Sequence, residues 1–155
     1  MYHIRVRACA LIVENDSVLL IQFTDEDGIH YNLPAGGTEP GETIIEAVKR
    51  EAYEEADVEV EVGELVFVSE NAPLMTGNKI HGLSLMFRCH MKENSIPTMP
   101  PNPDPNQTGV MWIPINELDN IILYPNIKDQ IIQYAKGKYQ NNRLIEEHKL
   151  KEQLT

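Results

Sequence analysis

A glycine-rich loop that leads into an amphipathic helix constrains this chain more than any other feature. The loop covers residues 35–42, and apolar residues then recur with the helical period over residues 43–56. At about 100° per residue, Glu51, Glu54 and Glu55 share an arc of about 100°. That arc borders an apolar stripe made of Ile45, Val48, Ala52 and Ala56. If the stripe packs on a sheet, the three carboxylates lie at the edge of a partly desolvated cleft.

Three like charges on one side of a helix need a counter-charge. Each pair spaced by three or four residues destabilises a helix by about 0.2–0.5 kcal/mol, and partial burial raises that cost. Arg50 can pair with Glu46 or Glu54, four residues away on either side. A bound divalent cation best explains the remaining carboxylates, because clustered oxygen ligands are its usual site. The alternative is an acidic face that water alone solvates.

The rest of the chain predicts an α+β protein in which strands outnumber helices. Alternating or short apolar runs predict six strands, at residues 3–14, 18–23, 29–35, 58–70, 80–91 and 110–115. The first two are expected to pair as a hairpin. Helical periods predict helices at 43–56 and 124–137, and five prolines within 94–109 predict a long loop. We expect one domain over residues 1–140 and a polar tail at 141–155, which is expected to be helical.

The formal net charge of −11 limits the classes of partner. So acidic a chain is not expected to bind a nucleic-acid polymer or an anionic membrane, and no run approaches the roughly 20 apolar residues of a membrane span. Cys9 and Cys89 have no disulfide or metal-site spacing, which predicts reduced thiols and a cytoplasmic location. A small anionic substrate remains compatible with this charge where local cations or a metal reverse the field.

The loop and helix resemble the Nudix box of the MutT-like Nudix hydrolases. That motif reads G-x5-E-x7-R-E-U-x-E-E-x-G-U, where U is a bulky aliphatic residue. The chain has matching residues at the expected spacing over 36–58, namely Gly36, Glu42, Arg50, Glu51, Glu54, Glu55 and Val58. Ala52 stands where a larger aliphatic residue is usual, and Asp57 replaces the glycine after the helix. Asp tolerates left-handed backbone better than most residues. Neither departure changes one of the box carboxylates, so neither implies loss of activity.

This resemblance implies both a fold and a reaction. The fold is an α/β/α sandwich around a central mixed β-sheet, with the box helix packed on that sheet. The reaction is metal-dependent hydrolysis, by water attack on phosphorus, of the diphosphate bond in a nucleoside diphosphate linked to another moiety. A homodimer is expected from the family tendency and from exposed strand edges. The alternative function is a nucleotide sensor of the same fold that binds without cleaving.

The resemblance also assigns roles to the box residues. Mg²⁺, with Mn²⁺ as a substitute, is expected to bind the carbonyl of Gly36 and the carboxylates of Glu51, Glu54 and Glu55. Arg50 is expected to orient a glutamate rather than to touch substrate, and Glu42 to act through a water molecule.

Substrate contacts are less specific in the sequence. The candidate phosphate ligands are three strand arginines, Arg5, Arg7 and Arg88. For each of them the alternative is a solvated or ion-paired side chain. His30 and Tyr31 directly precede the glycine loop and are candidate contacts to a base or a sugar.

The sequence leaves the general base open. In related hydrolases this carboxylate often lies in a loop after the box and before a strand that carries a tryptophan, and Asp104 is the acid in that loop here. Pro103 and Pro105 can hold Asp104 either over the site or outward in solvent. Glu54 lies in the box already and is the preferred base. A metal-bound hydroxide without a side-chain base is the third alternative.

Overall fold

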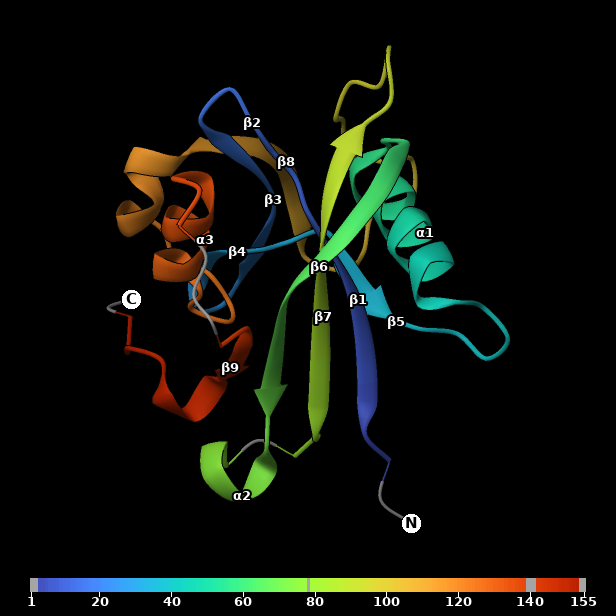
Figure 1. Ribbon diagram of the computed structural model, residues 1–155. Helices are drawn as coiled ribbons and strands as arrows, with labels where there is room; N and C mark the ends of the chain where they lie inside the picture. Colours follow the sequence, from blue (N-terminus) through green and yellow to red (C-terminus); the bar gives the residue numbers. More distant parts are fainter. Residues whose placement is uncertain (1–2, 78, 139–141, 154–155) are drawn as a thin grey trace.

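Two β-sheets with helices on both sides make up the molecule (Figure 1). The computed structural model describes residues 3–77, 79–138 and 142–153. Its larger sheet has the order β5-β1-β7-β6-β9. The strands of this sheet are β1 (Arg5–Leu11), β5 (Ala35–Gly37), β6 (Val60–Asn71), β7 (Gly82–Met91) and β9 (Leu144–Glu146). The sheet is mixed, because β1 runs parallel to β7 and β9 parallel to β6, whereas the other pairs are antiparallel.

The smaller sheet is built around β3 (Ser17–Asp25). Its partners are all antiparallel, namely β2 (Val13–Glu14), β4 (Gly28–Asn32) and β8 (Gln107–Pro114). The predicted hairpin with the N-terminal strand is short, since β2 pairs with β3 whereas β1 pairs with β5 and β7. Residues 8–12 are buried on both faces, which suits an inner strand of the larger sheet better than a hairpin arm.

Helix α1 (Ile44–Ala56) begins and ends where its sequence predicts. The Thr43 hydroxyl accepts a hydrogen bond from the Glu46 N–H at 3.1 Å, and the Glu46 carboxylate accepts one from the Thr43 N–H at 3.0 Å. Asp57 ends the helix in the left-handed region, with φ 56° and ψ 35°. The side of α1 that packs on the sheet is fully buried at Ala47, Val48, Ala52 and Ala56.

Alternation along β1 separates two hydrophobic cores. Ala8 and Ala10 belong to the core under α1, whereas Cys9 and Leu11 belong to the core on the other face. That second core is covered by α3 (Lys128–Ala135) and the 3₁₀ helix η1 (Ile115–Asn120), through Leu118 and Ile131. Figure 1 shows α1 and α3 on opposite sides of the sheets. The α/β/α sandwich around a mixed sheet is therefore confirmed.

The C-terminal segment differs from its prediction. Over residues 142–153, β9 and a 3₁₀ turn, η2 (Glu147–Lys149), are the regular elements. The prediction of a helical tail is therefore wrong for these residues. Residues 141, 154 and 155 lie outside the described residues. The open edge of β6 supplies the backbone partners for β9. Ile145 joins the core, and the Gln153 side chain accepts from the Leu123 N–H at 2.8 Å and donates to the Leu123 carbonyl at 2.6 Å. The segment therefore packs against the same domain.

Two smaller differences concern the helices. The helix predicted over 124–137 is shorter, because residues 124–127 lie outside α3, in keeping with the disfavoured helical backbone before Pro125. A one-turn helix, α2 (Pro73–Thr76), lies between β6 and β7. None of the helices in the described part of the chain is long and apolar enough to cross a membrane.

Candidate active site

Helix α1 presents its three box glutamates to different surroundings. Glu51 and Glu55 are buried, with 8% and 4% of their surface exposed. The Glu54 side chain, in contrast, is 55% exposed. Glu51 and Glu55 are one helical turn apart on the side of α1 that meets β1 and β5, while Glu54 lies further round toward solvent. Glu51 and Glu55 thus lie between α1 and the sheet, whereas Glu54 lines a cavity of about 440 Å³ beside the helix.

Strand β5 brings the glycine loop against Glu51. Gly36 pairs with Ala8 of β1. A side chain at Gly36 would collide with the Glu51 carboxylate, so a larger residue there would displace that carboxylate from its present position. Gly36 therefore lies directly beside the Glu51 carboxylate. That its carbonyl and this carboxylate bind one metal ion stays a prediction.

Glu55 is held by the strand that leads into the box. Its Oε1 accepts a hydrogen bond from the Ala35 N–H at 2.6 Å. Burial raises the pKa of Glu55 to about 8, although the Ala35 N–H opposes that shift. Interaction with the Asp104 side chain and the charge of Glu51 contribute to the same rise. Glu55 is therefore a buried carboxyl group without a full counter-charge.

Arg50 connects the box loop to the helix. Its Nε and Nη2 donate to the two carboxylate oxygens of Glu42 at 3.0 and 2.6 Å, and Nη2 also donates to the Gly37 carbonyl at 3.0 Å. Its Nη1 donates to Glu51 Oε1 at 2.6 Å and to Glu54 Oε2 at 3.3 Å. Arg50 thus contacts both the loop and two of the box glutamates, and its orienting role stays a prediction.

The expected pairing partners of Arg50 need one correction. Glu54 pairs with Arg50 as predicted, but the Glu46 carboxylate bonds to the Thr43 N–H because it completes the helix cap. Glu42 is predicted to act through a water molecule. Both of its carboxylate oxygens accept hydrogen bonds from Arg50, and these bonds lower the pKa of Glu42. Glu42 therefore holds Arg50 in place.

The donor set suits a divalent cation in its chemistry. Burial raises the pKa of Glu51 against the opposing effect of Arg50, and the charges of Glu54 and Asp104 raise it further. Within the described residues, no group of three or more Asp, Glu, His or Cys side chains is arranged to hold a metal ion, since Arg50 engages Glu51 and Glu54. Glu51 and Glu55 are nevertheless buried carboxyl groups against the glycine loop, and a bound cation would stabilise the ionised form that burial disfavours.

The proline-rich loop folds over the end of α1. Thr98 donates its N–H to the Ala56 carbonyl at 3.0 Å and its hydroxyl to Asp57 Oδ2 at 3.1 Å. Farther along the loop, the Asp104 side chain interacts with Glu55. Asp104 is exposed, and it lines the cavity of about 440 Å³ together with Glu54 and Asp57. It therefore lies over the end of α1 and is open to solvent at the same time.

Gln107 is a residue that sequence reasoning missed. It is buried, with 6% of its surface exposed, and its Nε2 donates to the backbone carbonyl of Glu55 at 2.8 Å. Its Oε1 accepts from the Asp104 N–H at 3.4 Å, and its N–H donates to the Asp104 carbonyl at 3.0 Å. Gln107 therefore ties the Asp104 turn to α1. No local pattern marks it, because a glutamine in a polar loop has no periodicity.

The three candidate arginines do not form one group. Arg7 pairs with Gly37 of β5, and the Arg5 side chain lies beside the same glycine. Arg88 is exposed and pairs with Leu11, six positions along β1 from Arg5. Arg5 and Arg7 thus lie next to the box loop, and Arg88 lies at the other end of the β1–β7 pair.

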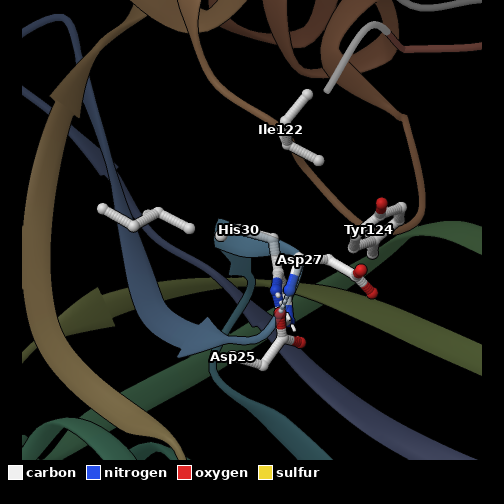
Figure 2. A pocket seen from close by; sticks show the side chains of 7 residues that line it. Asp25, Asp27, His30, Ile122 and Tyr124 are labelled. Atoms are coloured by element: carbon white, nitrogen blue, oxygen red, sulfur yellow. Dashed lines mark hydrogen bonds and ion pairs between the residues drawn. The ribbon is translucent and has the colours of Figure 1, made fainter.

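His30 and Tyr31 point to opposite faces of β4. His30 stacks on Phe23 and lines a cavity of about 300 Å³ together with Asp25 and Tyr124 (Figure 2). The Tyr31 ring is buried in the core, where its hydroxyl accepts from Gln22 Nε2 at 3.0 Å. Of this predicted pair, His30 is the residue that faces a cavity.

The family of this chain follows from a match over most of its length. The NUDIX domain model matches residues 1–135, a stretch that contains β5, α1 and the carboxylates described above. The chain belongs to the NUDIX domain family. Its Nudix box is therefore the loop and helix over residues 36–58, with Gly36 against Glu51 and Arg50 between loop and helix.

Solved structures support this assignment. A NUDIX hydrolase from Nitrosomonas europaea is 25% identical to this Nudix chain, with a TM-score of 0.72 over 88% of this chain and 92% of that one. An ADP-ribose pyrophosphatase from Streptococcus suis is 18% identical and shares the fold, with a TM-score of 0.65 over 93% of this chain and 99% of that one.

A curated human protein shares part of the sequence. The protein named 8-oxo-dGDP phosphatase NUDT18 is 50% identical over 62 residues, which is 39% of this chain and 19% of the human protein. The matched stretch thus spans about a fifth of that relative. It supports family membership, and the relative's own activity is a property of a much longer chain.

Proposed function

We propose that this chain is a divalent-metal-dependent Nudix hydrolase. Its reaction is the cleavage, by water attack on phosphorus, of the diphosphate bond in a nucleoside diphosphate linked to another moiety. The observation that carries the proposal is the buried pair Glu51 and Glu55 beside Gly36, at the box positions of a family whose solved members include hydrolases. A purely structural helix gains nothing from two buried, under-compensated carboxylates.

Several box residues would bind the cation together. Glu51, Glu55 and the Gly36 carbonyl would hold Mg²⁺ or Mn²⁺, with Glu54 as the further predicted ligand. When bound, such an ion neutralises diphosphate charge and lowers the pKa of a coordinated water molecule. Arg50 keeps Glu51 and Glu54 in place through its contacts with Glu42 and Gly37.

Two arginines support binding of the phosphates. Arg5 and Arg7 lie beside Gly37, on the strand next to the box loop. Their positive charge opposes the net charge of −11, which otherwise repels an anionic substrate. Arg88 and His30 lie farther along the sheets and would contact other parts of the substrate.

The proton of the attacking water needs an acceptor. Glu54 is 55% exposed, so a water molecule can reach its carboxylate beside Arg50, which keeps it the preferred base. Asp104 gains support from its place in one cavity with Glu54, in a turn that the hydrogen bonds of Gln107 fix. A metal-bound hydroxide without a side-chain base is the remaining alternative.

A substrate panel tests the proposed reaction. Nucleoside diphosphate derivatives, including sugar nucleotides, dinucleoside polyphosphates and oxidised nucleotides, are incubated with the full chain and Mg²⁺, and phosphate is measured after phosphatase treatment. We expect turnover on at least one compound and its loss with a chelator. Nucleotide-dependent thermal stabilisation without turnover on any compound would instead indicate the non-catalytic sensor.

The cellular location and the oligomeric state belong to the same proposal. We expect a cytoplasmic enzyme, since both cysteines are free and buried. We also expect a homodimer, which light scattering at micromolar concentration checks. A single 17.6 kDa species would contradict that expectation.

A further inference from the structure

Asp57 departs from the Nudix box at the position that ends helix α1. Its backbone is left-handed, with φ 56° and ψ 35°, and its N–H donates to the Tyr53 carbonyl at 3.0 Å. Glycine adopts this conformation without strain, whereas a residue with a Cβ adopts it at a cost. Backbone geometry alone therefore favours the glycine of the motif, and only the side chain of Asp57 can add a contact that glycine lacks.

The Asp57 carboxylate holds the proline-rich loop. Its Oδ2 accepts a hydrogen bond from the Thr98 hydroxyl at 3.1 Å, and the Thr98 N–H donates to the Ala56 carbonyl at 3.0 Å. The second bond joins two backbone groups and would survive a glycine at position 57. The first bond would not, because it needs the side chains of both Asp57 and Thr98. The departure from the box thus adds a side-chain contact between the end of α1 and the loop.

Prolines extend the effect of this contact along the loop. Gln107 holds the far end of the segment, since its side chain donates to the Glu55 carbonyl at 2.8 Å. Proline fixes φ near about −65°, so a proline-rich segment has few free torsions once both of its ends are held. Four of the eight residues between Thr98 and Gln107 are prolines, namely Pro100, Pro101, Pro103 and Pro105. The position of Thr98 therefore restricts where the whole segment can lie.

The same segment forms one wall of the cavity beside Glu54. The cavity of about 440 Å³ is lined by Glu54 and Asp57 at the end of the helix, and by Pro100, Pro101 and Asp104 from the loop. The two candidates for the general base, Glu54 and Asp104, thus line one cavity from opposite elements. A displacement of the loop would move Asp104 relative to Glu54 and would change the room for a water molecule between them.

We propose that Asp57 is a positioning residue for the hydrolysis, which acts by holding Thr98 and thereby the loop wall of the cavity beside Glu54. The inference rests on the proposed function for its reaction. Small displacements of the groups that act on an attacking water lower kcat, whereas contacts to the rest of the substrate are unchanged. The effect of losing the Asp57 side chain therefore belongs to kcat and not to KM.

The test replaces Asp57 by the glycine of the motif. D57G removes the carboxylate and suits the left-handed backbone. D16G is the matched control, because Asp16 has a φ of 58° in the turn between β2 and β3, and its backbone carbonyl accepts from the Ile115 N–H. With Mg²⁺ and a proven substrate, we expect kcat to fall about fivefold or more in D57G, with KM within about twofold, and both to be unchanged in D16G. Wild-type kcat in D57G, or an equal loss in D16G, overturns the inference.

Two further variants separate positioning from stability. D57N keeps a side-chain oxygen that can accept from Thr98, so we expect it to retain kcat within about twofold of the wild type. T98V keeps the shape of the side chain without its hydroxyl, and its loss should equal that of D57G. The double variant D57G/T98V should lose no more than either single variant, because one contact is removed in all three. A loss in D57N as large as that in D57G, or additive losses in the double variant, contradicts the proposal.

Hydrogen exchange tests the contact without a substrate. The N–H groups of Thr98 and Gln107 are both hydrogen-bonded, to the carbonyls of Ala56 and Asp104. We expect both amides to exchange at least about tenfold faster in D57G and T98V than in the wild type and D16G. Unchanged exchange in D57G refutes the positioning role even if the substrate panel shows hydrolysis. Faster exchange in a chain that hydrolyses no panel compound supports the contact and contradicts the proposed function instead.

Discussion

The box helix and the proline-rich loop both bring carboxylates to one site, but they place them by different means. Glu51 and Glu55 are set by the regular geometry of α1, whose first residues are capped by Thr43. Asp104 is set by long-range hydrogen bonds, since the Thr98 N–H and the Gln107 side chain bond to backbone carbonyls of α1. The positions of side chains on a helix follow from residue spacing, whereas the conformation of the loop depends on contacts between residues far apart in sequence. The site should therefore tolerate changes in the two regions very differently.

The largest expected effect is at the helix. E55Q keeps the shape of the side chain and removes one negative charge, so we expect kcat to fall by about three orders of magnitude with Mg²⁺ and a proven substrate. Steady-state kinetics measure the loss. Wild-type turnover in E55Q, or wild-type activity that survives a chelator, would remove the metal assignment.

The same variant makes a prediction about pH. The pKa of Glu55 rises from 4.5 to about 8 on folding, so between those values the folded chain retains a proton that the unfolded chain releases. Stability of the metal-free protein should therefore fall as pH rises through that window. At pH 8 without metal, E55Q should unfold at a higher temperature than the wild type, and added Mg²⁺ should stabilise the wild type alone. Thermal unfolding at pH 5 and pH 8 checks both statements.

The second-largest effect distinguishes Glu54 of the box helix from Asp104 of the proline-rich loop as the general base. If Glu54 is the base, E54Q should lose about 100-fold in kcat and D104N much less. Both variants are compared across a pH series, with the metal concentration for half-maximal activity measured alongside. A loss in D104N that matches or exceeds that of E54Q, at unchanged metal affinity, would move the base to the loop.

A smaller effect is expected at Gln107, whose hydrogen bonds connect the proline-rich loop to α1. Q107M keeps the side-chain volume and removes the hydrogen bonds to the Glu55 carbonyl and the Asp104 N–H. We expect about a tenfold loss in kcat with little change in KM. In the D104N background, Q107M should cost no more than D104N alone, because the two residues act as one unit. Fully additive losses would show that Gln107 acts elsewhere.

The smallest effect concerns stability rather than chemistry. T43A removes the cap of α1, and we expect it to lower the free energy of unfolding by about 1 kcal/mol. Urea denaturation measures the change, and kcat should stay within twofold of the wild type. A large loss of kcat in a folded T43A would mean that the first turn of α1 controls the carboxylates directly.

The local features of the site could be predicted from sequence. The Thr43 cap, the left-handed Asp57 and the side of α1 that carries Glu51 and Glu55 depend on residues within one or two helical turns. Short-range spacing determines them, and a sequence displays spacing directly. The sandwich followed from the box resemblance and from the alternation of the strands.

The features that were missed depend on distant partners. β9 has three residues, too few to show a period, and it forms because the edge of β6 is open to it. Gln107 has no pattern of its own and acquires its role from the Glu55 carbonyl, 52 positions away. Asp57 likewise lies 41 positions from Thr98. Such contacts become visible only when the fold is known.

The strand pairing has a consequence for how the chain folds. β1 of the larger sheet pairs with β7, and β3 of the smaller sheet pairs with β8, so each sheet joins the first 25 residues to residues beyond 81. Neither half of the chain can complete a sheet alone, and the many non-local pairs predict slow folding for a protein of this size. Two separately expressed fragments, divided in the loop between β6 and β7, should accordingly remain unstructured until they are mixed.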